Sequence, residues 1–117
     1  MFTLKIDNCT YKVSFHHVMK TDLMNKLKHT VCSIQLVTEV ADQKPIYHTL
    51  STGVSYCSEK DNFNYNKGRK VALARALQYY NDKDYRKLFW DAYFKKQAFD
   101  QQVSITHQII KELEQED

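Results

Sequence analysis

The segment from Cys57 to Leu77 constrains the fold most, because its composition changes within a few residues. Its first part is crowded with short polar residues that favour turns and helix N-caps: Asp61, Asn62, Asn64 and Asn66. Apolar residues then recur at the spacing of one buried helix face: Leu73, Ala76, Leu77 and Tyr80. The sequence therefore predicts a polar loop that leads, around Gly68, into an amphipathic helix.

The predicted helix start has the chemistry of an anion site. Unpaired N–H groups and the helix dipole favour phosphate or carboxylate there, and Lys67, Arg69 and Lys70 add flexible cations. The alternative is an ordinary capped helix with solvated cations. Gly68 is followed by Arg69 rather than by Lys and Ser or Thr, and no other glycine lies nearby. A Walker A phosphate loop, and with it a nucleoside-triphosphate hydrolase, is therefore not expected.

Alternating apolar and polar residues dominate the first half of the chain. This period predicts antiparallel strands at residues 2–6, 11–19, 31–40 and 46–57, of which three or four form the sheet. Asp7 and Asn8 predict the turn of a hairpin between the first two. Residues 21–27 carry only a short helical pattern, which we interpret as a loop with helical character.

The second half has helical spacing. Asp82 or Asp84 is expected to cap a helix that continues through Phe89, and Asp100 to lead a further segment. That segment has apolar residues spaced for burial: Val103, Ile105, Ile109, Ile110 and Leu113. It packs either on its own sheet or on a partner helix, since an exposed apolar face is a liability. The predicted class is α+β, a small antiparallel sheet from the N-terminal half followed by two or three helices.

Length and composition fit one domain over residues 1–117. Strands would occupy 1–57, a binding loop and helix start 58–70, and helices 71–117. Three widely spaced cysteines without a CxxC pair indicate reduced intracellular thiols. The chain shows no apolar run long enough to span a bilayer and no signal-peptide core, so we expect a cytoplasmic protein without a membrane partner.

Charge is unevenly spread along the chain. Residues 66–99, hereafter the basic segment, hold nine Lys or Arg against three acids, a net charge of +6. Residues 100–117 hold one Lys against five acids, a net charge of −4. The acidic end could neutralise the basic segment within one protomer or between protomers. Eight Tyr, six Phe and one Trp exceed the needs of a small core, so some are expected at an interface or against a flat ligand.

Catalytic signatures are missing from the sequence. His16 and His17 are neighbours on a predicted strand and so point to opposite faces, which prevents joint chelation of a metal. The other histidines have no ligand spacing with Cys, Asp or Glu, and no known nucleophile or zinc motif occurs. We therefore expect neither an enzyme, nor a metal site, nor a cofactor.

Phe63 stands apart from the other aromatic residues, because it lies in the polar loop between Asn62 and Asn64. Its ring could stack on a base while the flanking amides read a base edge. Alternatively, Phe63 tucks under the loop as a hydrophobic staple to Val71 or Leu73. The sequence leaves both open.

Three runs resemble a pattern found in small phage proteins: GVSYC at 53–57, DNFN at 61–64 and GRKVALARAL at 68–77. In that pattern a strand ends in cysteine, a D-[NQ]-F turn follows, and G-R-K-[VI]-A-L-x-R-A-L opens a helix. The chain is thus similar to phage-encoded Thoeris anti-defence proteins of the first described kind, although residues 1–50 carry no part of the motif. The resemblance implies capture, without cleavage, of cyclic ADP-ribose-type immune signals and in some members cyclic oligonucleotides, by a dimer or an assembly of dimers.

The leading hypothesis is therefore a phage anti-defence protein in the cytoplasm of an infected bacterial cell that sequesters a nucleotide-derived signal. Phosphates would lie on Arg69, Lys70 and the helix start, and Arg75 is a second cation if a neighbouring protomer closes the site. The predicted ligand-binding residues are Asn62, Phe63, Asn64, Lys67, Arg69, Lys70 and Arg75.

Two other functions fit the same sequence. The chain could inhibit a nucleic-acid-handling defence complex, or regulate by binding nucleic acid, through the basic segment; strong salt dependence would mark binding to nucleic acid. It could also be a structural virion protein whose aromatic surplus forms a subunit interface.

Overall fold

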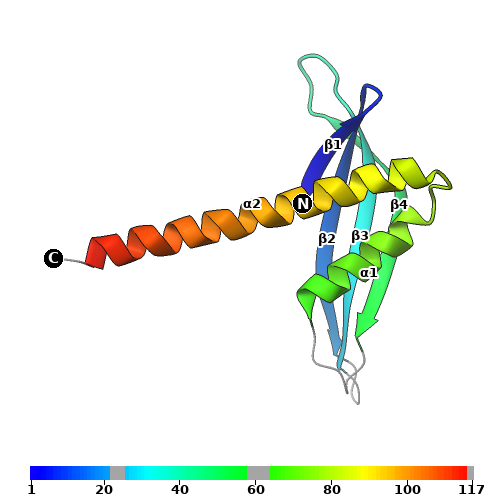
Figure 1. Ribbon diagram of the computed structural model, residues 1–117. Coiled ribbons are helices and arrows are strands. Elements are labelled where there is room, and N and C mark those ends of the chain that lie inside the picture. Colours follow the sequence, from blue (N-terminus) through cyan, green and yellow to red (C-terminus); the bar gives the residue numbers. More distant parts are fainter. Residues whose placement is uncertain (22–25, 58–63, 116–117) are drawn as a thin grey trace.

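The computed structural model describes residues 1–21, 26–57 and 64–115. It contains a four-stranded antiparallel sheet followed by two helices, which confirms the predicted α+β class (Figure 1). The strands are β1 (Phe2–Ile6), β2 (Cys9–Thr21), β3 (Lys26–Thr38) and β4 (Ile46–Cys57), hydrogen-bonded in the order β1-β2-β3-β4. The helices are α1 (Tyr65–Leu77) and α2 (Lys83–Gln115).

The alternation of the strands places one face of the sheet under the helices. Across β2 and β3 the residues of this face stand opposite one another in four pairs: Tyr11 and Leu36, Val13 and Ile34, Phe15 and Cys32, and His17 and Thr30. The buried core joins this face to both helices through Phe2, Ile6, Tyr11, Val13, Cys32, Ile34, Ala72, Leu73, Ala76, Leu77, Phe89 and Tyr93. The predicted hairpin turn is confirmed, since Asp7 and Asn8 join β1 to β2 with positive φ angles of 50° and 67°.

The ladder between β2 and β3 is longer than the sequence predicts. Thr21 pairs with Lys26, so strand structure enters the segment that we expected to be a loop with helical character. Residues 22–25 lie outside the described residues. Cross-strand hydrogen bonds outweigh a helical pattern of only one or two turns, because an isolated helix of that length is unstable.

The C-terminal half is one continuous helix after the α1–α2 connection, so of the two or three helices expected the structure has two, and the segment from Asp100 onward belongs to α2. Asp82 is the N-cap of α2, since its carboxylate accepts hydrogen bonds from the backbone N–H groups of Asp84 (2.9 Å) and Tyr85 (3.4 Å). Asp100 lies inside the helix, where its carboxylate pairs with the Lys96 ammonium at 3.0 Å. A single Asp without a following glycine or proline does not interrupt a helix.

Both glycines mark close approaches of α1 to the sheet. A Cβ at Gly53 would lie 2.1 Å from the carbonyl oxygen of Ala72 and 2.4 Å from the backbone nitrogen of Ala76. A Cβ at Gly68 would lie 2.7 Å from Oγ1 of Thr30. The lack of side chains therefore lets α1 lie directly on β4 and β3.

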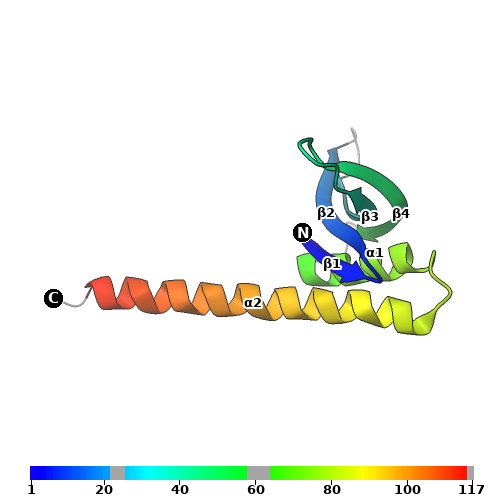
Figure 2. The same ribbon diagram turned by 90° about the horizontal axis from the view of Figure 1, so that it is seen from above.

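α1 lies against the sheet on β3 and β4, and α2 passes across the same side of the sheet and contacts β1 (Figures 1 and 2). The first part of α2 is anchored by Phe89, whose ring centroid lies 5.6 Å from that of Tyr11 and 5.5 Å from that of Tyr80. The second part of α2 projects beyond the sheet, with the C-terminal end far from it. Neither described helix combines the length and apolarity needed to cross a membrane.

Candidate functional site: a basic and aromatic cavity

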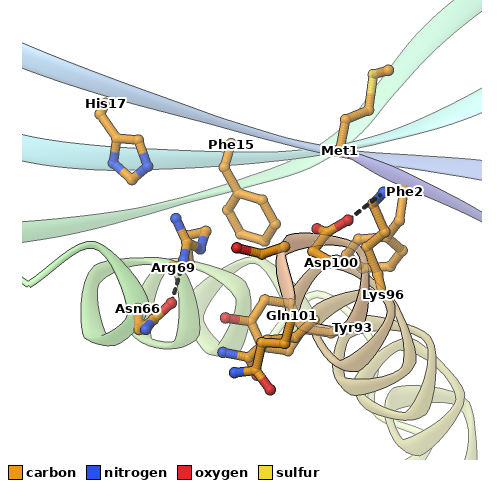
Figure 3. A pocket seen from close by; sticks show the side chains of 12 residues that line it. Met1, Phe2, Phe15, His17, Asn66, Arg69, Tyr93, Lys96, Asp100 and Gln101 are labelled. Atoms are coloured by element: carbon orange, nitrogen blue, oxygen red, sulfur yellow. Dashed lines mark hydrogen bonds and ion pairs between the residues drawn. The ribbon is translucent and has the colours of Figure 1, made fainter. Parts of the chain in front are cut away.

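A cavity of about 490 Å³ lies where the sheet and both helices meet. Its volume is in the range of small-molecule binding sites. Figure 3 shows the side chains that line it, contributed by the start of the chain, β1, β2, α1 and α2: Met1, Phe2, Phe15, His17, Asn66, Arg69, Tyr93, Lys96, Gln97, Asp100, Gln101 and Ser104.

Two cationic side chains reach this cavity from different helices. Arg69 comes from α1, and its guanidinium donates a hydrogen bond to Oδ1 of Asn66, which holds the group in place (Figure 3). Lys96 comes from α2 and is paired with Asp100. An arginine fixed by a neighbouring amide is preorganised for a phosphate or carboxylate.

Aromatic rings form the apolar part of the lining. Phe2 of β1, Phe15 of β2 and Tyr93 of α2 pack on one another, with centroid separations of 6.4 Å between the two phenyl rings and 6.2 and 6.0 Å from these rings to Tyr93. Such mutually packed rings offer a rigid apolar surface at low entropic cost. The cavity therefore joins cationic groups to a surface suited to a planar group.

His17 stands beside Arg69 at the edge of the sheet. Its Nδ1 and Oγ1 of the fully buried Thr30 share a hydrogen bond of 2.9 Å, and its ring meets Tyr65 edge-on at 4.5 Å. Loss of solvent lowers the pKa of His17 from 6.5, and the charges of Arg69 and His16 lower it further. An anion at Arg69 would offset part of that effect, so His17 belongs electrostatically to the cavity.

Among the predicted ligand-binding residues that the structure describes, Arg69 is the one that lines the cavity. Asn62 and Phe63 lie outside the described residues, so stacking and stapling remain alternatives for Phe63. Asn64 is the N-cap of α1, and its Oδ1 accepts a hydrogen bond from the Lys67 backbone N–H at 3.2 Å. The ordinary cap that we weighed against an anion site is thus present at this position.

The remaining predicted cations point elsewhere. The exposed Lys67 side chain is absent from the cavity lining, and the Lys70 ammonium lies 5.7 Å from the ring centroid of Phe94. Arg75 donates to the backbone carbonyl of Val54 on β4. Within one protomer, the structure therefore separates Arg69 from the other cations of its motif.

Sequence reasoning missed most of the lining, although two signals were present. Side chains alternate between the two faces of a strand, and His17 occupies an odd-numbered position of β2, as Tyr11, Val13 and Phe15 do. Its side chain is therefore expected on the face that packs against the helices. On α2, spacings of three and four residues put six lining residues on one helix face: Tyr93, Lys96, Gln97, Asp100, Gln101 and Ser104. Treating the residues from Asp100 onward as a further segment concealed this continuous face.

The described residues contain no cluster of three or more His, Cys, Asp or Glu that could hold a metal ion. Cys9, Cys32 and Cys57 all lie in the described part of the chain and form no disulfide with one another. Burial raises the pKa of Cys32 to about 12, which makes this thiol a poor nucleophile.

Comparison of the chain with models of protein families, with curated proteins and with solved structures finds no match.

Proposed function

We propose that the protein is a phage anti-defence protein that binds a nucleotide-derived immune signal and sequesters it without cleaving it. The signal is of the cyclic ADP-ribose type or a cyclic oligonucleotide, and the site of action is the cytoplasm of an infected bacterial cell. One observation carries the proposal. Arg69, from the G-R-K run of the phage motif, lines a cavity that also contains a second cation and an aromatic surface.

A nucleotide matches the two kinds of surface in this cavity. Its phosphates can accept charge-assisted hydrogen bonds from Arg69 and Lys96. Its base can lie against the rings of Phe2 or Phe15. The amide groups of Gln97 and Gln101 supply donors and acceptors for ribose hydroxyls or base edges.

Sequestration requires enclosure and preorganised donors rather than a nucleophile or general base. Asn66 already orients Arg69, so little side-chain entropy remains to be lost when a phosphate binds. The ligand is therefore expected to leave the protein chemically unchanged.

We also propose that the protein acts as a homo-oligomer, a dimer or an assembly of dimers. The second part of α2 exposes large apolar side chains at Phe99, Val103, Ile105, Ile109, Ile110 and Leu113. A second copy is the partner that fits, because the acidic residues 100–117 complement the basic segment of another protomer. Burial of this apolar face against a copy removes it from water.

The function is tested by heating protein purified from cells that make the signal and analysing the released small molecules by mass spectrometry. An intact nucleotide signal is the expected result, and a cleaved one contradicts sequestration. Titration of the protein with cyclic ADP-ribose then gives the affinity. Arg69→Ala should weaken it roughly tenfold to a hundredfold or more, the equivalent of about 1.5–3 kcal/mol.

Lys95→Ala is the matched control, because it removes one positive charge from the basic segment but not from the cavity lining. It should leave affinity for cyclic ADP-ribose within about twofold of the parent. Equal binding by Arg69→Ala and Lys95→Ala contradicts the proposed site. No release and no binding of any nucleotide signal contradicts the function.

Nucleic-acid binding is the second candidate, favoured by a groove between the helices. Lys83, Arg86 and Lys87 line this groove beside Trp90, and Asp84 is the acidic residue of the lining. Such a surface could stack a base and neutralise a backbone. Two results would support this function over sequestration. Affinity for an oligonucleotide should fall strongly as salt is added, and Lys87→Ala should weaken that affinity more than Arg69→Ala does.

A further inference from the structure

Tyr93 is a buried residue of the cavity with an unsatisfied polar atom. Its side chain is 5% exposed, and its hydroxyl has no hydrogen-bond partner among the residues that the structure describes. Buried polar groups are nearly always hydrogen-bonded, because desolvation without a partner is unfavourable. The Tyr93 hydroxyl is therefore expected to have a hydrogen-bond partner that the chain itself does not supply among its described residues.

The ring of Tyr93 cannot easily turn its hydroxyl away. Four aromatic rings surround it at centroid distances of 5.4–6.2 Å: Phe2, Phe15, Trp90 and Phe94. Figure 3 shows the side chain reaching from α2 toward α1, on the same helix face as Lys96 and Gln101. The packing thus fixes a hydrogen-bonding group within the lining of the cavity.

We propose that the Tyr93 hydroxyl binds the nucleoside part of the ligand, through a ribose hydroxyl or a base edge. This inference rests on the proposed function and names the part of the ligand that the α2 side of the cavity recognises. A phosphate is the poorer match for this position, because Tyr93 is neutral and its neighbours Phe2 and Phe15 are apolar. Arg69 and Lys96 offer full charges for phosphate elsewhere in the same cavity.

Tyr80 provides an internal control for this assignment. Its hydroxyl is also buried and lacks a partner among the described residues, but Tyr80 does not line the cavity. Its ring packs against Tyr79, Tyr85 and Phe89 at 5.0–5.5 Å, and burial is the main cause that raises its pKa to about 12. Tyr80→Phe and Tyr93→Phe therefore make the same chemical change in two buried aromatic clusters.

The experiment titrates parent, Tyr93→Phe, Tyr80→Phe and Arg69→Ala with two probes, cyclic ADP-ribose and inorganic pyrophosphate. Tyr93→Phe should weaken binding of cyclic ADP-ribose about tenfold and leave pyrophosphate binding unchanged. Tyr80→Phe should change neither, and Arg69→Ala should weaken both. The melting temperature of each Tyr→Phe variant should stay level or rise, since each loses an unsatisfied buried hydroxyl.

The possible failures are separable. If Tyr93→Phe binds cyclic ADP-ribose as tightly as Tyr80→Phe while Arg69→Ala does not, the hydroxyl makes no contact with the ligand. The inference is then wrong and the proposed function stands. If Tyr93→Phe loses pyrophosphate affinity equally, Tyr93 contacts phosphate and the assignment to the nucleoside is wrong. If the parent binds neither probe nor any signal released from cells, the proposed function fails and this inference fails with it.

Discussion

The two parts of α2 differ sharply in what surrounds them, although they belong to one uninterrupted helix. Residues 83–94 contribute the buried Phe89 and Tyr93 to the core. Residues 99–114 are exposed along their whole length, including Ile109, Ile110 and Leu113. Apolar residues at helix spacing thus appear in both parts, but only the first meets a partner within the chain. Amphipathic spacing predicts that a face is to be buried, not what buries it.

The largest difference is expected when the same substitution is made in both parts. Phe89 is completely buried, so Phe89→Ala should lower the free energy of unfolding by about 3–5 kcal/mol through lost transfer energy and a cavity. Phe99 is 60% exposed, and Phe99→Ala should cost only about 0.5 kcal/mol in dilute protein. Urea unfolding of both variants at low concentration checks this. Similar losses would mean that the projecting part also packs within the protomer.

Association should respond in the opposite way. Ile110→Ser with Leu113→Ser removes two apolar side chains of the projecting part, each worth about 1.5 kcal/mol or more if buried by a second copy. The dissociation constant of the oligomer should therefore rise roughly a hundredfold or more, while helix content in dilute protein stays the same. Sedimentation measures this, with the exposed Gln108→Ser as control. A monomeric parent would remove the proposal of a homo-oligomer.

Asp100 lies near the start of the projecting part of α2 and also lines the cavity. Its carboxylate forms an ion pair with the Lys96 ammonium at 3.0 Å, and its negative charge repels an anionic ligand. Asp100→Asn should thus raise affinity for cyclic ADP-ribose about threefold to fivefold, because an exposed pair is worth up to about 1 kcal/mol. The gain should shrink in high salt. Asp91→Asn makes the same charge change outside the cavity lining, and an equal gain there would show that only net charge matters.

The smallest expected effect is a pH dependence of the free energy of unfolding that arises from His17 of β2. The folded protein holds the pKa of His17 below its ordinary value of 6.5, so the unfolded state binds more protons between the two values. Stability should therefore rise with pH through this interval and fall as the pH drops below 6.5. As the pH falls from about 7 to about 5, His17→Gln should therefore lose less stability than the parent.

Thermal unfolding across this range checks the change in slope, and His107→Gln in the projecting part of α2 is the matched control. An unchanged slope in His17→Gln would show that the packing of His17 on Thr30 and Tyr65 has no effect on its protonation.

The order of elements was predictable because it is encoded in local periods. Alternation specified the strands, Asp7 and Asn8 the first turn, and Asp82 the cap of α2. Each of these depends on residues a few positions apart, whose preferred conformations follow from their own side chains. Whether Asp100 begins a third helix or continues the second was left open for a related reason, since a polar residue on a helix is compatible with a cap and equally with an ion pair one turn away.

The candidate site was only partly predictable. The motif pointed to Arg69, which does line the cavity, but gave the same weight to Lys70 and added Arg75 as a second cation for a site closed by a neighbouring protomer. Only the packing of α1 on β3 and β4, set by Gly68 and Gly53, turns Arg69 inward and places Lys70 on Phe94. Residues one apart on a helix differ by about 100° in direction, and which direction faces a neighbour depends on elements far away in the sequence.

The amino-acid sequence by itself thus determined a sheet followed by helices, a basic segment next to an acidic one, and an apolar face on the last helix. The tertiary structure decided that His17, Arg69, Tyr93 and Lys96 share one cavity, although they come from β2, α1 and α2. The physical reason is that secondary structure follows from interactions between neighbours in the chain. A cavity instead depends on how rigid elements meet, which burial and close backbone contact fix only after the whole chain has folded.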